Sequence, residues 1–380
     1  VARVVTPGTV SDEAFLEERR DTLLGAVCSL KGVWGLATLD MASGRFRVQE
    51  LNSIELLQAE LARVSPAELL YPEDAGWKEQ ISDCRGLRAR MPWHFEHESA
   101  YRQLCQQFAV YDLQGYGCEQ LPAAITAAGA LLGYARETQR SALPHLRGIS
   151  VENARETLQM DAATRRNLEL TQNLQGENQA TLAAVIDQTR SPMGSRLLRR
   201  WLHQPIRQRE TLRARQQAIS ELLDLQAWDE LGDWLANVGD GERILARIAL
   251  RTARPRDLAR LRDLLALLPA ISGWLLPQES QRLRELRTAI RPFPSLAETL
   301  RRALVEAPPV VLRDGGVLAE GFDAELDELR GISTHAGDYL IALETQERER
   351  SGIAGLKIGY NRVRGYYFEL SRAQAEQAPA

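Results

Sequence analysis

Basic, amide and tyrosine side chains are concentrated near the end of the sequence, where they could contact phosphate and sugar. Residues 356–361 and 366–371 are typical of two strands, and residues 362–365 join them with Gly365 at the turn. The polar and aromatic residues of this hairpin are Lys357, Asn361, Arg362, Arg364, Tyr366, Tyr367 and Arg372. Such groups position a protein on a nucleic-acid backbone without reading its sequence. The same residues also fit an ordinary exposed hairpin. Strand alternation places Tyr367 and Glu369 on the face opposite Tyr366 and Phe368, so only some of them can face one ligand.

A second candidate is an arginine-rich helix predicted over residues 193–203, after Ser191-Pro192 and before Pro205. One face carries Leu197, Leu198, Trp201 and Leu202, and the other carries Arg196, Arg199 and Arg200. This pattern suits a helix packed in a core beside a polyanion or a carboxylate cluster. From these residues alone, a solvated arginine face is the favoured alternative.

Several kinds of site find no support in the sequence. None of the three lysines (Lys31, Lys78, Lys357) is followed by Ser or Thr, so there is no P-loop for ATP. The four cysteines form no CxxC pair and are expected to be free thiols in a reducing cytosol. His94 and His97 have the spacing of metal ligands, but no other candidate ligand lies near them in the sequence.

No apolar run is long enough for a membrane span, and no signal peptide is visible. The net charge of −4 does not by itself indicate a nucleic-acid-binding protein. Nearly all of the positive charge is arginine, whose planar guanidinium group matches phosphate and carboxylate.

The elements that must position these residues divide the chain into an α/β part and a mainly helical part. Up to about residue 140 we expect strands at 33–40 and 45–51 joined by a hairpin loop with Gly44. A helix at 54–64, a short strand at 67–71 and a helix at 121–139 follow. From about residue 141 the pattern is helical, with helices expected at 240–250 and 257–268. Arg243, Arg247 and Arg251 recur on one face of the first of these.

A long helix is predicted from Gly321 to about Arg350. Its apolar seam alternates spacings of four and three, as in a coiled coil, through Phe322, Leu326, Leu329, Ser333, Ala336, Leu340 and Leu343. The next seam positions are Glu347 and Arg350. We therefore expect the end of this helix, a rod of about 45 Å, to project into solvent beyond Leu343. A plain bundle helix with a frayed end is the alternative.

Five segments carry a family resemblance. They are TPGTVSDEAFLEER (6–19), DAATRRNLEL (161–170), PMGSRLLRRWLHQP (192–205), GDGERILARIALRTARPRDL (239–258) and LKIGYNRVRGYYFELSR (356–372). Together they resemble the MutS family of bacterial DNA mismatch-repair recognition proteins. They follow the family's order and cover essentially the whole chain.

The resemblance implies a multidomain protein: a ribonuclease H-like α/β connector domain (1–140), a helical core and lever domain (141–343), and the truncated start of a DNA clamp with its first β-hairpin (344–380). The parent would bind and enclose mismatched duplex DNA as a homodimer and couple this to ATP. ATP and Mg²⁺ are expected in an ATPase domain absent from this chain, which is therefore predicted not to be an enzyme. A cytoplasmic, nucleoid-associated protein with no membrane contact is implied.

By location in the clamp, the resemblance makes Lys357, Asn361, Arg362 and Arg364 the candidates for DNA-backbone contact. In the family the connector offers a surface to the repair partner MutL. The candidates for that contact on this chain are Arg102, Gln103 and Gln106. With DNA contact assigned to the hairpin, Arg196, Arg199 and Arg200 are expected to pair with carboxylates between core helices.

The sequence allows three further interpretations. Phe15-Leu16-Glu17 matches the family's mismatch-reading Phe-x-Glu motif, but it follows a connector segment and is interpreted as the start of a helix with Phe15 facing inward. A ribonuclease H-like nuclease would need a carboxylate cluster around Asp40, with Glu68, Glu73 and Asp74 as further candidates. Asp40 leads into a hairpin loop, where Asp is common for local hydrogen bonding. A helical scaffold without a nucleic-acid role is the remaining alternative.

Overall fold

The computed structural model describes residues 4–10, 12–225, 228–363 and 365–371. The chain forms two compact units, and each is described by itself. Unit 1 holds the residues up to Arg301 together with Glu306–Gly315, and unit 2 holds Arg302–Val305 and the residues from Gly316 onward.

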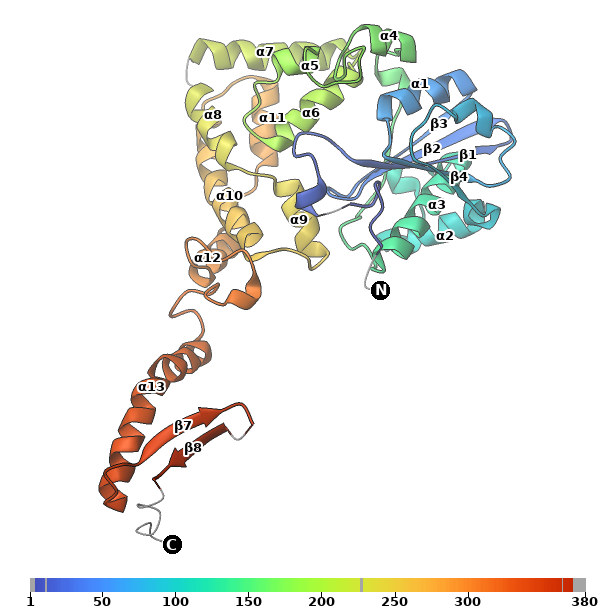
Figure 1. The fold of residues 1–380 in the computed structure, drawn as a ribbon. Coiled ribbons are helices and arrows are strands. Elements are labelled where there is room, and N and C mark those ends of the chain that lie inside the picture. The colour runs from blue at the N-terminus through green and yellow to red at the C-terminus, as the bar shows by residue number, and fades with distance from the viewer. Residues whose placement is uncertain (1–3, 11, 226–227, 364, 372–380) are drawn as a thin grey trace. The chain divides into compact units, whose positions relative to one another are not determined.

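Unit 1 begins with a six-stranded mixed sheet (Figure 1). The strands are β1 (Leu23–Leu30), β2 (Val33–Asp40), β3 (Arg45–Leu51), β4 (Glu68–Pro72), β5 (Leu87–Arg90) and β6 (Ser150–Val151), in the order β5-β4-β1-β2-β3-β6. The pairs β1–β2 and β2–β3 are antiparallel, whereas β1–β4, β4–β5 and β3–β6 are parallel. The predicted hairpin at 33–51 is confirmed, and Gly44 has the positive φ (76°) that its turn requires.

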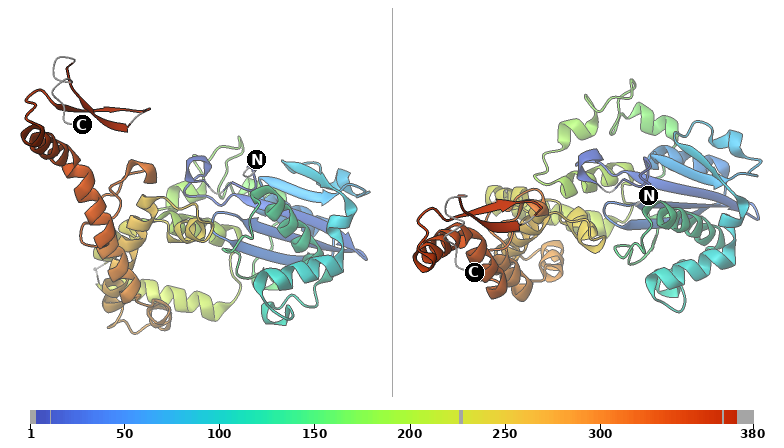
Figure 2. Two further views of the ribbon diagram at one scale, coloured as in Figure 1. Left: turned by 90° about the horizontal axis from the view of Figure 1, so that it is seen from below. Right: turned by 60° about the horizontal axis from the view of Figure 1, so that its bottom comes forward.

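Helices cover both faces of this sheet. On one face α1 (Ile54–Val64) buries Leu57 and Leu61 against Trp34 and Leu36. On the other face α2 (His97–Phe108) and α3 (Pro122–Gln139) pack over Leu39 and its neighbours, and both views of Figure 2 keep these two helices on the same side of the sheet. α3 is buried almost throughout, which explains why its sequence is rich in alanine and nearly free of charge.

The α/β pattern is confirmed. β4 is shifted by one residue from the strand predicted at 67–71, and β1, β5 and β6 were not predicted. β6 joins the sheet from beyond residue 140, pairing Arg47 with Ser150 and Val48 with Val151. The predicted domain boundaries at residues 140 and 343 remain predictions.

The rest of unit 1 is helical. Its helices are α4 (Ala162–Asn167), α5 (Leu182–Ile186), α6 (Pro192–His203), α7 (Arg209–Leu225), α8 (Trp228–Asn237), α9 (Gly241–Ala249), α10 (Pro255–Trp274), α11 (Gln281–Ala289) and α12 (Pro294–Ala303), whose last two residues fall in unit 2. Two small apolar cores hold them together, one around Ile271 and Leu275 and one around Ile244 and Leu261. The helix expected at 257–268 is longer than predicted, because Pro255 opens α10 at a first-turn position and the helix continues to Trp274.

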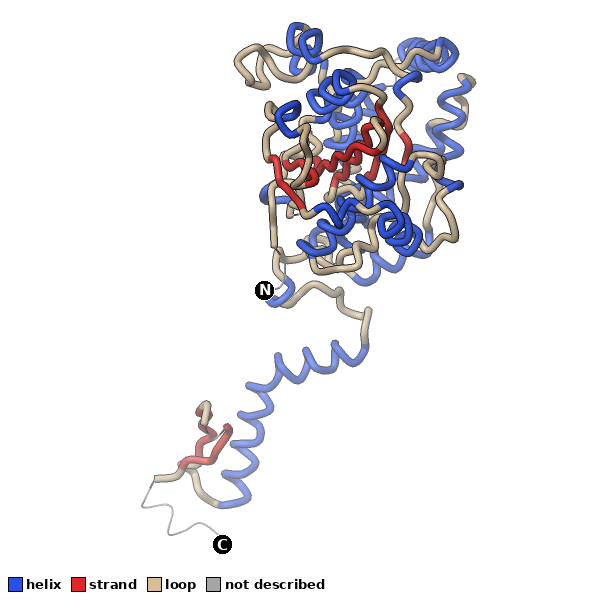
Figure 3. The backbone as a smooth tube through the Cα atoms, turned by 90° about the vertical axis from the view of Figure 1, so that its right-hand side faces the viewer, coloured by secondary structure: helices blue, strands red, loops and turns tan. Residues whose placement is uncertain are grey.

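Unit 2 contains one long helix and one hairpin. α13 (Ala324–Ser351) starts on its N-cap residue Asp323 and ends at Gly352, which has φ 67°. The hairpin of β7 (Lys357–Asn361) and β8 (Gly365–Glu369) folds back beside the C-terminal half of α13 (Figure 3). Phe322 precedes the helix, and Leu329 is 57% exposed, so pairing along the predicted seam remains a prediction.

The first turn of α3 rests directly on the sheet at Gly35. A Cβ built on Gly35 would lie 2.0 Å from the carbonyl oxygen of Ala123. Opposite Gly35 on β3, the Glu50 carboxylate accepts the N–H groups of Ala123 (2.7 Å) and Ala124 (3.3 Å), which the helix itself leaves unpaired. The missing side chain and the capping carboxylate together set how closely α3 approaches β2.

We predict that Gly35→Ala lowers the free energy of unfolding of unit 1 by about 3 kcal/mol, because the added methyl meets backbone that cannot yield. All seven tryptophans lie in unit 1, so tryptophan fluorescence in a urea titration reports this unit. Gly115→Ala is the matched control, since a Cβ there meets nothing within 4 Å, and it should change stability by less than about 0.5 kcal/mol. Equal effects of the two substitutions would contradict this account of the contact.

Candidate nucleic-acid interface and arginine network

The β7–β8 hairpin has two chemically different faces. Its register pairs Lys357 with Glu369, Tyr360 with Tyr366, and Asn361 with Gly365. Because side chains alternate along a strand, Lys357, Tyr367 and Glu369 share one face, which we call the polar face. The other, the aromatic face, carries Ile358, Tyr360, Tyr366 and Phe368.

The predicted DNA contacts lie on the polar face and the turn. Lys357 and Arg362 are exposed, and Asn361 is half-buried. The Oδ1 of Asn361 accepts the N–H of Val363 at 3.1 Å, a role in holding the turn that the sequence did not reveal. Arg364, the fourth candidate, lies outside the described residues, as does Arg372.

The aromatic face is apolar and largely open. The rings of Tyr360 and Tyr366 lie 5.0 Å apart, and Tyr360, Tyr366 and Phe368 are between 51% and 62% exposed. This division places cationic groups on one side of the hairpin and stacking or packing groups on the other.

The hairpin is fixed to the end of α13 by charged groups. Glu344 accepts the N–H of Ile358 (2.9 Å), and Arg348 donates to the carbonyl of Leu356 (2.8 Å) and pairs with Glu344 (2.5 Å). Ile353 and Leu356 are buried beneath this contact. The expectation that the helix projects into solvent beyond Leu343 is therefore met only in part: its last turns carry the strand that follows on one side, whereas Thr345, Gln346, Glu349 and Arg350 are exposed.

The three candidates for a protein partner lie on α2 with different exposures. Arg102 and Gln106 are exposed, whereas Gln103 is half-buried and donates to the hydroxyl of Ser99 (3.2 Å). Arg102 donates to the backbone carbonyl of Glu98 at 3.3 Å. The helix face toward solvent thus carries two of the three residues.

In unit 1, the arginine face of α6 is the buried face. Arg196 is 1% exposed and makes a two-pronged contact with Asp240 (2.7 and 2.8 Å), with a further hydrogen bond to Glu242 (2.9 Å). Burial by itself would lower the pKa of Arg196, but the two carboxylates raise it above its ordinary value. The pairing with carboxylates is confirmed for Arg196, and the alternative of a solvated arginine face is wrong.

The apolar face of α6 is the more exposed one. Leu197 is 41% exposed and Trp201 is 40% exposed, with the guanidinium of Arg215 stacked 3.7 Å above the Trp201 ring. Periodicity identified the two faces correctly but not which of them is buried, since a charged face buries readily where carboxylates meet it.

The carboxylates and carbonyls that meet these arginines come from both parts of unit 1. Asp21, just before β1, accepts from Arg45 of β3 (3.1 Å) and from Arg200 of α6 (3.2 Å). Although burial raises the pKa of Asp21, the two arginines hold it below its ordinary value. Arg199 lies 3.7 Å from Asp187.

Backbone carbonyls of residues 17–20 complete the set. Arg196 donates to the carbonyl of Glu18 (2.8 Å), and Arg243 of α9 donates to those of Glu17 (3.0 Å) and Arg20 (2.7 Å). We call Asp21, Arg196, Arg200, Asp240, Glu242 and Arg243 the arginine network. It joins the sheet to the helices, and its only signal in the sequence is arginine at helical spacing near Asp240-Gly241-Glu242.

The alternative sites resolve into structural roles. Asp40 is fully buried and accepts from the N–H of Ala42 (3.0 Å) and the hydroxyl of Ser43 (2.6 Å), so it closes the β2–β3 turn. Glu68 accepts the hydroxyl of Tyr134 (2.6 Å). Among the described residues, no group of three or more His, Cys, Asp or Glu side chains is arranged to hold a metal ion.

Phe15 does not face inward as expected. It ends a short 3-10 helix (Glu13–Phe15) and is 77% exposed, whereas the next residue, Leu16, is buried. A single 3-10 turn rotates its side chains differently from the α-helix that the sequence suggested. No helix of the described chain combines the length and hydropathy needed to cross a membrane.

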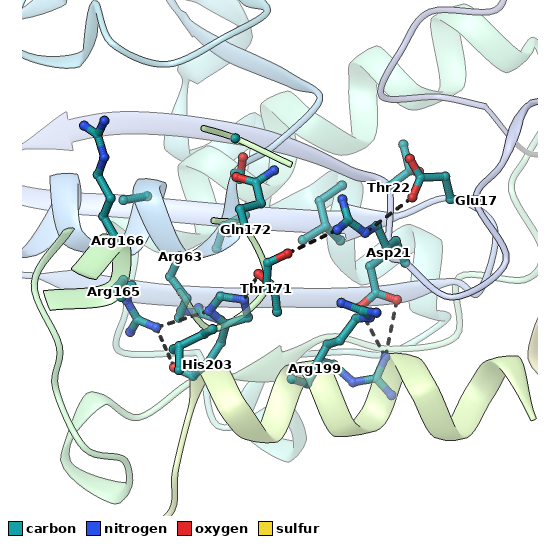
Figure 4. Close-up of a pocket in the computed structure, with 18 of the residues that line it drawn as sticks. Glu17, Asp21, Thr22, Arg63, Arg165, Arg166, Thr171, Gln172, Arg199 and His203 are labelled. Carbon is teal, nitrogen blue, oxygen red and sulfur yellow. Dashed lines mark hydrogen bonds and ion pairs between the residues drawn. The ribbon is translucent and has the colours of Figure 1, made fainter. Parts of the chain in front are cut away.

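A pocket of about 860 Å³ opens beside the arginine network (Figure 4). Its walls come from α1, α4, α6 and the segments around residues 15–23 and 170–176. In Figure 4, Arg63, Arg165 and His203 lie at one end of the pocket and Glu17 and Asp21 at the other. The pocket is lined by seven arginines, a feature that the sequence did not predict because they are spread over four segments: Arg20, Arg63, Arg165, Arg166, Arg196, Arg199 and Arg200.

We predict that Arg196→Met lowers the free energy of unfolding of unit 1 by about 3 kcal/mol, because it removes the two-pronged contact of the largely buried Asp240 carboxylate and leaves it only the longer contact with Arg243 (3.6 Å). The control is Arg301→Met, whose side chain is 69% exposed in a pair with Glu298 and whose loss should cost less than about 1 kcal/mol. Urea titration followed by tryptophan fluorescence measures both. A loss for Arg196→Met no larger than that of the control would show that the network contributes no net stability.

Comparison with known families agrees with these two halves of the chain. Residues 22–147, which contain strands β1–β5 and helices α1–α3, match MutS domain II. Residues 163–377, more than half of the chain, match MutS domain III and include α6, the arginine-bearing helices and the hairpin. The chain therefore belongs to the MutS family, whose domains II and III point to DNA mismatch repair.

Proposed function

We propose that this chain contributes to mismatch recognition by holding duplex DNA through its backbone at the β7–β8 hairpin. The observation that carries the proposal is the polar face and turn, which present exposed Lys357 and Arg362 on a two-stranded ribbon. Such contacts neutralise phosphates and fix position without selecting a base. The mismatch itself would be read elsewhere in the assembly.

In this proposal α13 is the lever that links the hairpin to the helical part. Glu344 and Arg348 fasten β7 to the last turns of the helix, so a tilt of the helix would move the hairpin with it. A helix of 28 residues is about 42 Å long, which converts a small rotation at its base into a larger displacement at its tip. Transmission of this kind is a mechanical hypothesis.

The connector role is proposed for the α/β part, with a ribonuclease H-like arrangement. Supporting it are three antiparallel strands, β1–β3, extended by β4 and β5 running parallel to β1, with helices on both faces. Asp40 serves a turn in this arrangement, so the proposal assigns no nuclease chemistry to it.

We also propose that DNA binding is coupled to ATP, through a part of the assembly other than this chain. The sequence has no P-loop lysine, so ATP and Mg²⁺ would act in another domain of a homodimeric, cytoplasmic and nucleoid-associated protein. The competing function is a helical scaffold without a nucleic-acid role, and DNA binding by the chain separates the two.

We predict that the chain binds duplex DNA with an affinity that falls steeply between about 50 and about 200 mM salt, because neutralised phosphates release their counterions. Lys357→Ala and Arg362→Ala should each reduce the slope of log K against log salt by about 1, because each removes one phosphate contact. Fluorescence anisotropy with a labelled duplex measures this. Because backbone contacts ignore base identity, matched and mismatched duplexes should respond alike.

Arg313→Ala is the control for lost positive charge, since Arg313 is 88% exposed and belongs to unit 1. It should leave the slope unchanged. Binding that does not depend on salt, or equal slopes in all variants, would favour the scaffold.

A contact with the repair partner MutL is proposed for the exposed face of α2. Arg102→Ala and Gln106→Ala should each weaken MutL binding by about tenfold, as loss of an interface contact worth about 1.4 kcal/mol does. Gln103→Ala should have a smaller effect, because that side chain is half-buried against its own helix. Surface plasmon resonance with immobilised MutL is the measurement.

The control for this contact is Gln80→Ala, an exposed glutamine on the opposite side of the sheet, in a 3-10 helix (Lys78–Ile81). Unchanged binding in all three α2 variants, with native circular dichroism, would rule out this surface.

A further inference from the structure

Some of the arginines that line the pocket beside the arginine network have a nearby carboxylate, and others do not. Five of its seven arginines lie within 4 Å of a carboxylate, as Arg20 does with Glu17 and Arg63 with Glu60 and Glu152. Arg165 and Arg166, consecutive residues of α4, have no carboxylate within that distance among the described residues. Arg166 is exposed and can rely on water, but Arg165 cannot.

Arg165 is a buried cation, and part of its guanidinium group has no hydrogen-bond partner in the structure. Its side chain belongs to a residue only 8% exposed, yet it is held by neutral groups. Nη1 donates to the carbonyl of His203 (2.7 Å) and faces Nδ1 of the same residue (3.4 Å), while Nε is buried without a hydrogen-bond partner. Burying a guanidinium in this way costs several kcal/mol unless an anion joins it.

The surroundings of Arg165 favour an anion further. The ring of His203 lies between two groups, with Nδ1 3.4 Å from Nη1 of Arg165 and Nε2 2.9 Å from the hydroxyl of Thr171. Burial and the nearby Arg165, Arg63 and Arg199 lower the pKa of His203 to about 4, so the ring is neutral at pH 7.

We propose that the end of this pocket at Arg63, Arg165 and His203 binds a phosphate group, either as the free anion or as the phosphate of a small ester. The guanidinium of Arg165, which has no carboxylate within 4 Å among the described residues, suits an anion with several oxygens. The carboxylate end of the pocket, at Glu17 and Asp21, would repel a second anion and so directs the phosphate to Arg165 (Figure 4). The volume of about 860 Å³ leaves room for the remainder of an ester.

The proposal is tested by isothermal titration calorimetry of the whole chain with sodium phosphate, with adenosine monophosphate and with sodium chloride at matched ionic strength. Binding of phosphate or of the monophosphate, but not of chloride, is the expected result. Tighter binding of free phosphate identifies the anion as the ligand, and tighter binding of the monophosphate identifies an ester. The absence of saturable binding by both, up to millimolar concentration, would overturn the proposal whatever the variants do.

Arg165→Met should weaken this binding at least about tenfold, the loss expected for a charge-assisted hydrogen bond. Without phosphate the same substitution should leave the stability of unit 1 unchanged or higher, since it removes a buried charge that has no partner. Arg313→Met, at an exposed position, should alter neither quantity. Phosphate binding that is the same in Arg165→Met and Arg313→Met would assign the phosphate to another place and refute the proposed site.

Discussion

Unit 1 depends on the burial of arginine against carboxylates and backbone carbonyls. Among the described residues, the apolar clusters lie mostly within the sheet part or within the helical part, and Leu250, at the end of α9, is the residue of the helical part that packs against the cluster of the sheet. What also crosses between them is the arginine network, in which Asp21 bridges β3 and α6 while Arg196 and Arg243 hold the irregular segment at residues 17–20 by its carbonyls. An irregular segment has unpaired carbonyls to offer, and a guanidinium has enough donors to collect several of them.

Polar contacts of this kind suit a protein whose parts must keep fixed positions relative to one another. Hydrogen bonds between charged groups require a particular geometry, whereas an apolar surface tolerates sliding. Charged side chains have the same role in unit 2, where Glu344 and Arg348 fix the hairpin to α13 through backbone groups of Leu356 and Ile358. Proposed DNA contacts at Lys357 and Arg362 would thereby act on a rigid helix rather than on a free loop.

Helices and strands with a strong local pattern could be predicted from the sequence. The contacts that distant segments make around the candidate residues could not. The β2–β3 hairpin, α1, α3 and α6 follow from period, glycine position and proline position, which act within a few residues. The buried side of α6 depended on Asp21 and Asp240, which are far from it in sequence. The covered side of the last turns of α13 depended on residues that return to them after a turn, and the exposure of Phe15 depended on a 3-10 turn replacing a helix. The pocket required five separate segments to meet.

By itself, the sequence determined the family, through five long segments in order, and the identity and periodicity of those helices and strands that have a strong local pattern. It also determined that arginine would provide nearly all of the positive charge. Only the tertiary structure decided which arginines are neutralised. Whether a guanidinium finds a carboxylate, a carbonyl or nothing depends on distances of a few ångströms between distant segments, because charge pairing falls away once water or another residue intervenes. Arg196 and Arg165 are alike in sequence, and the fold gives one three acidic partners and leaves the other none.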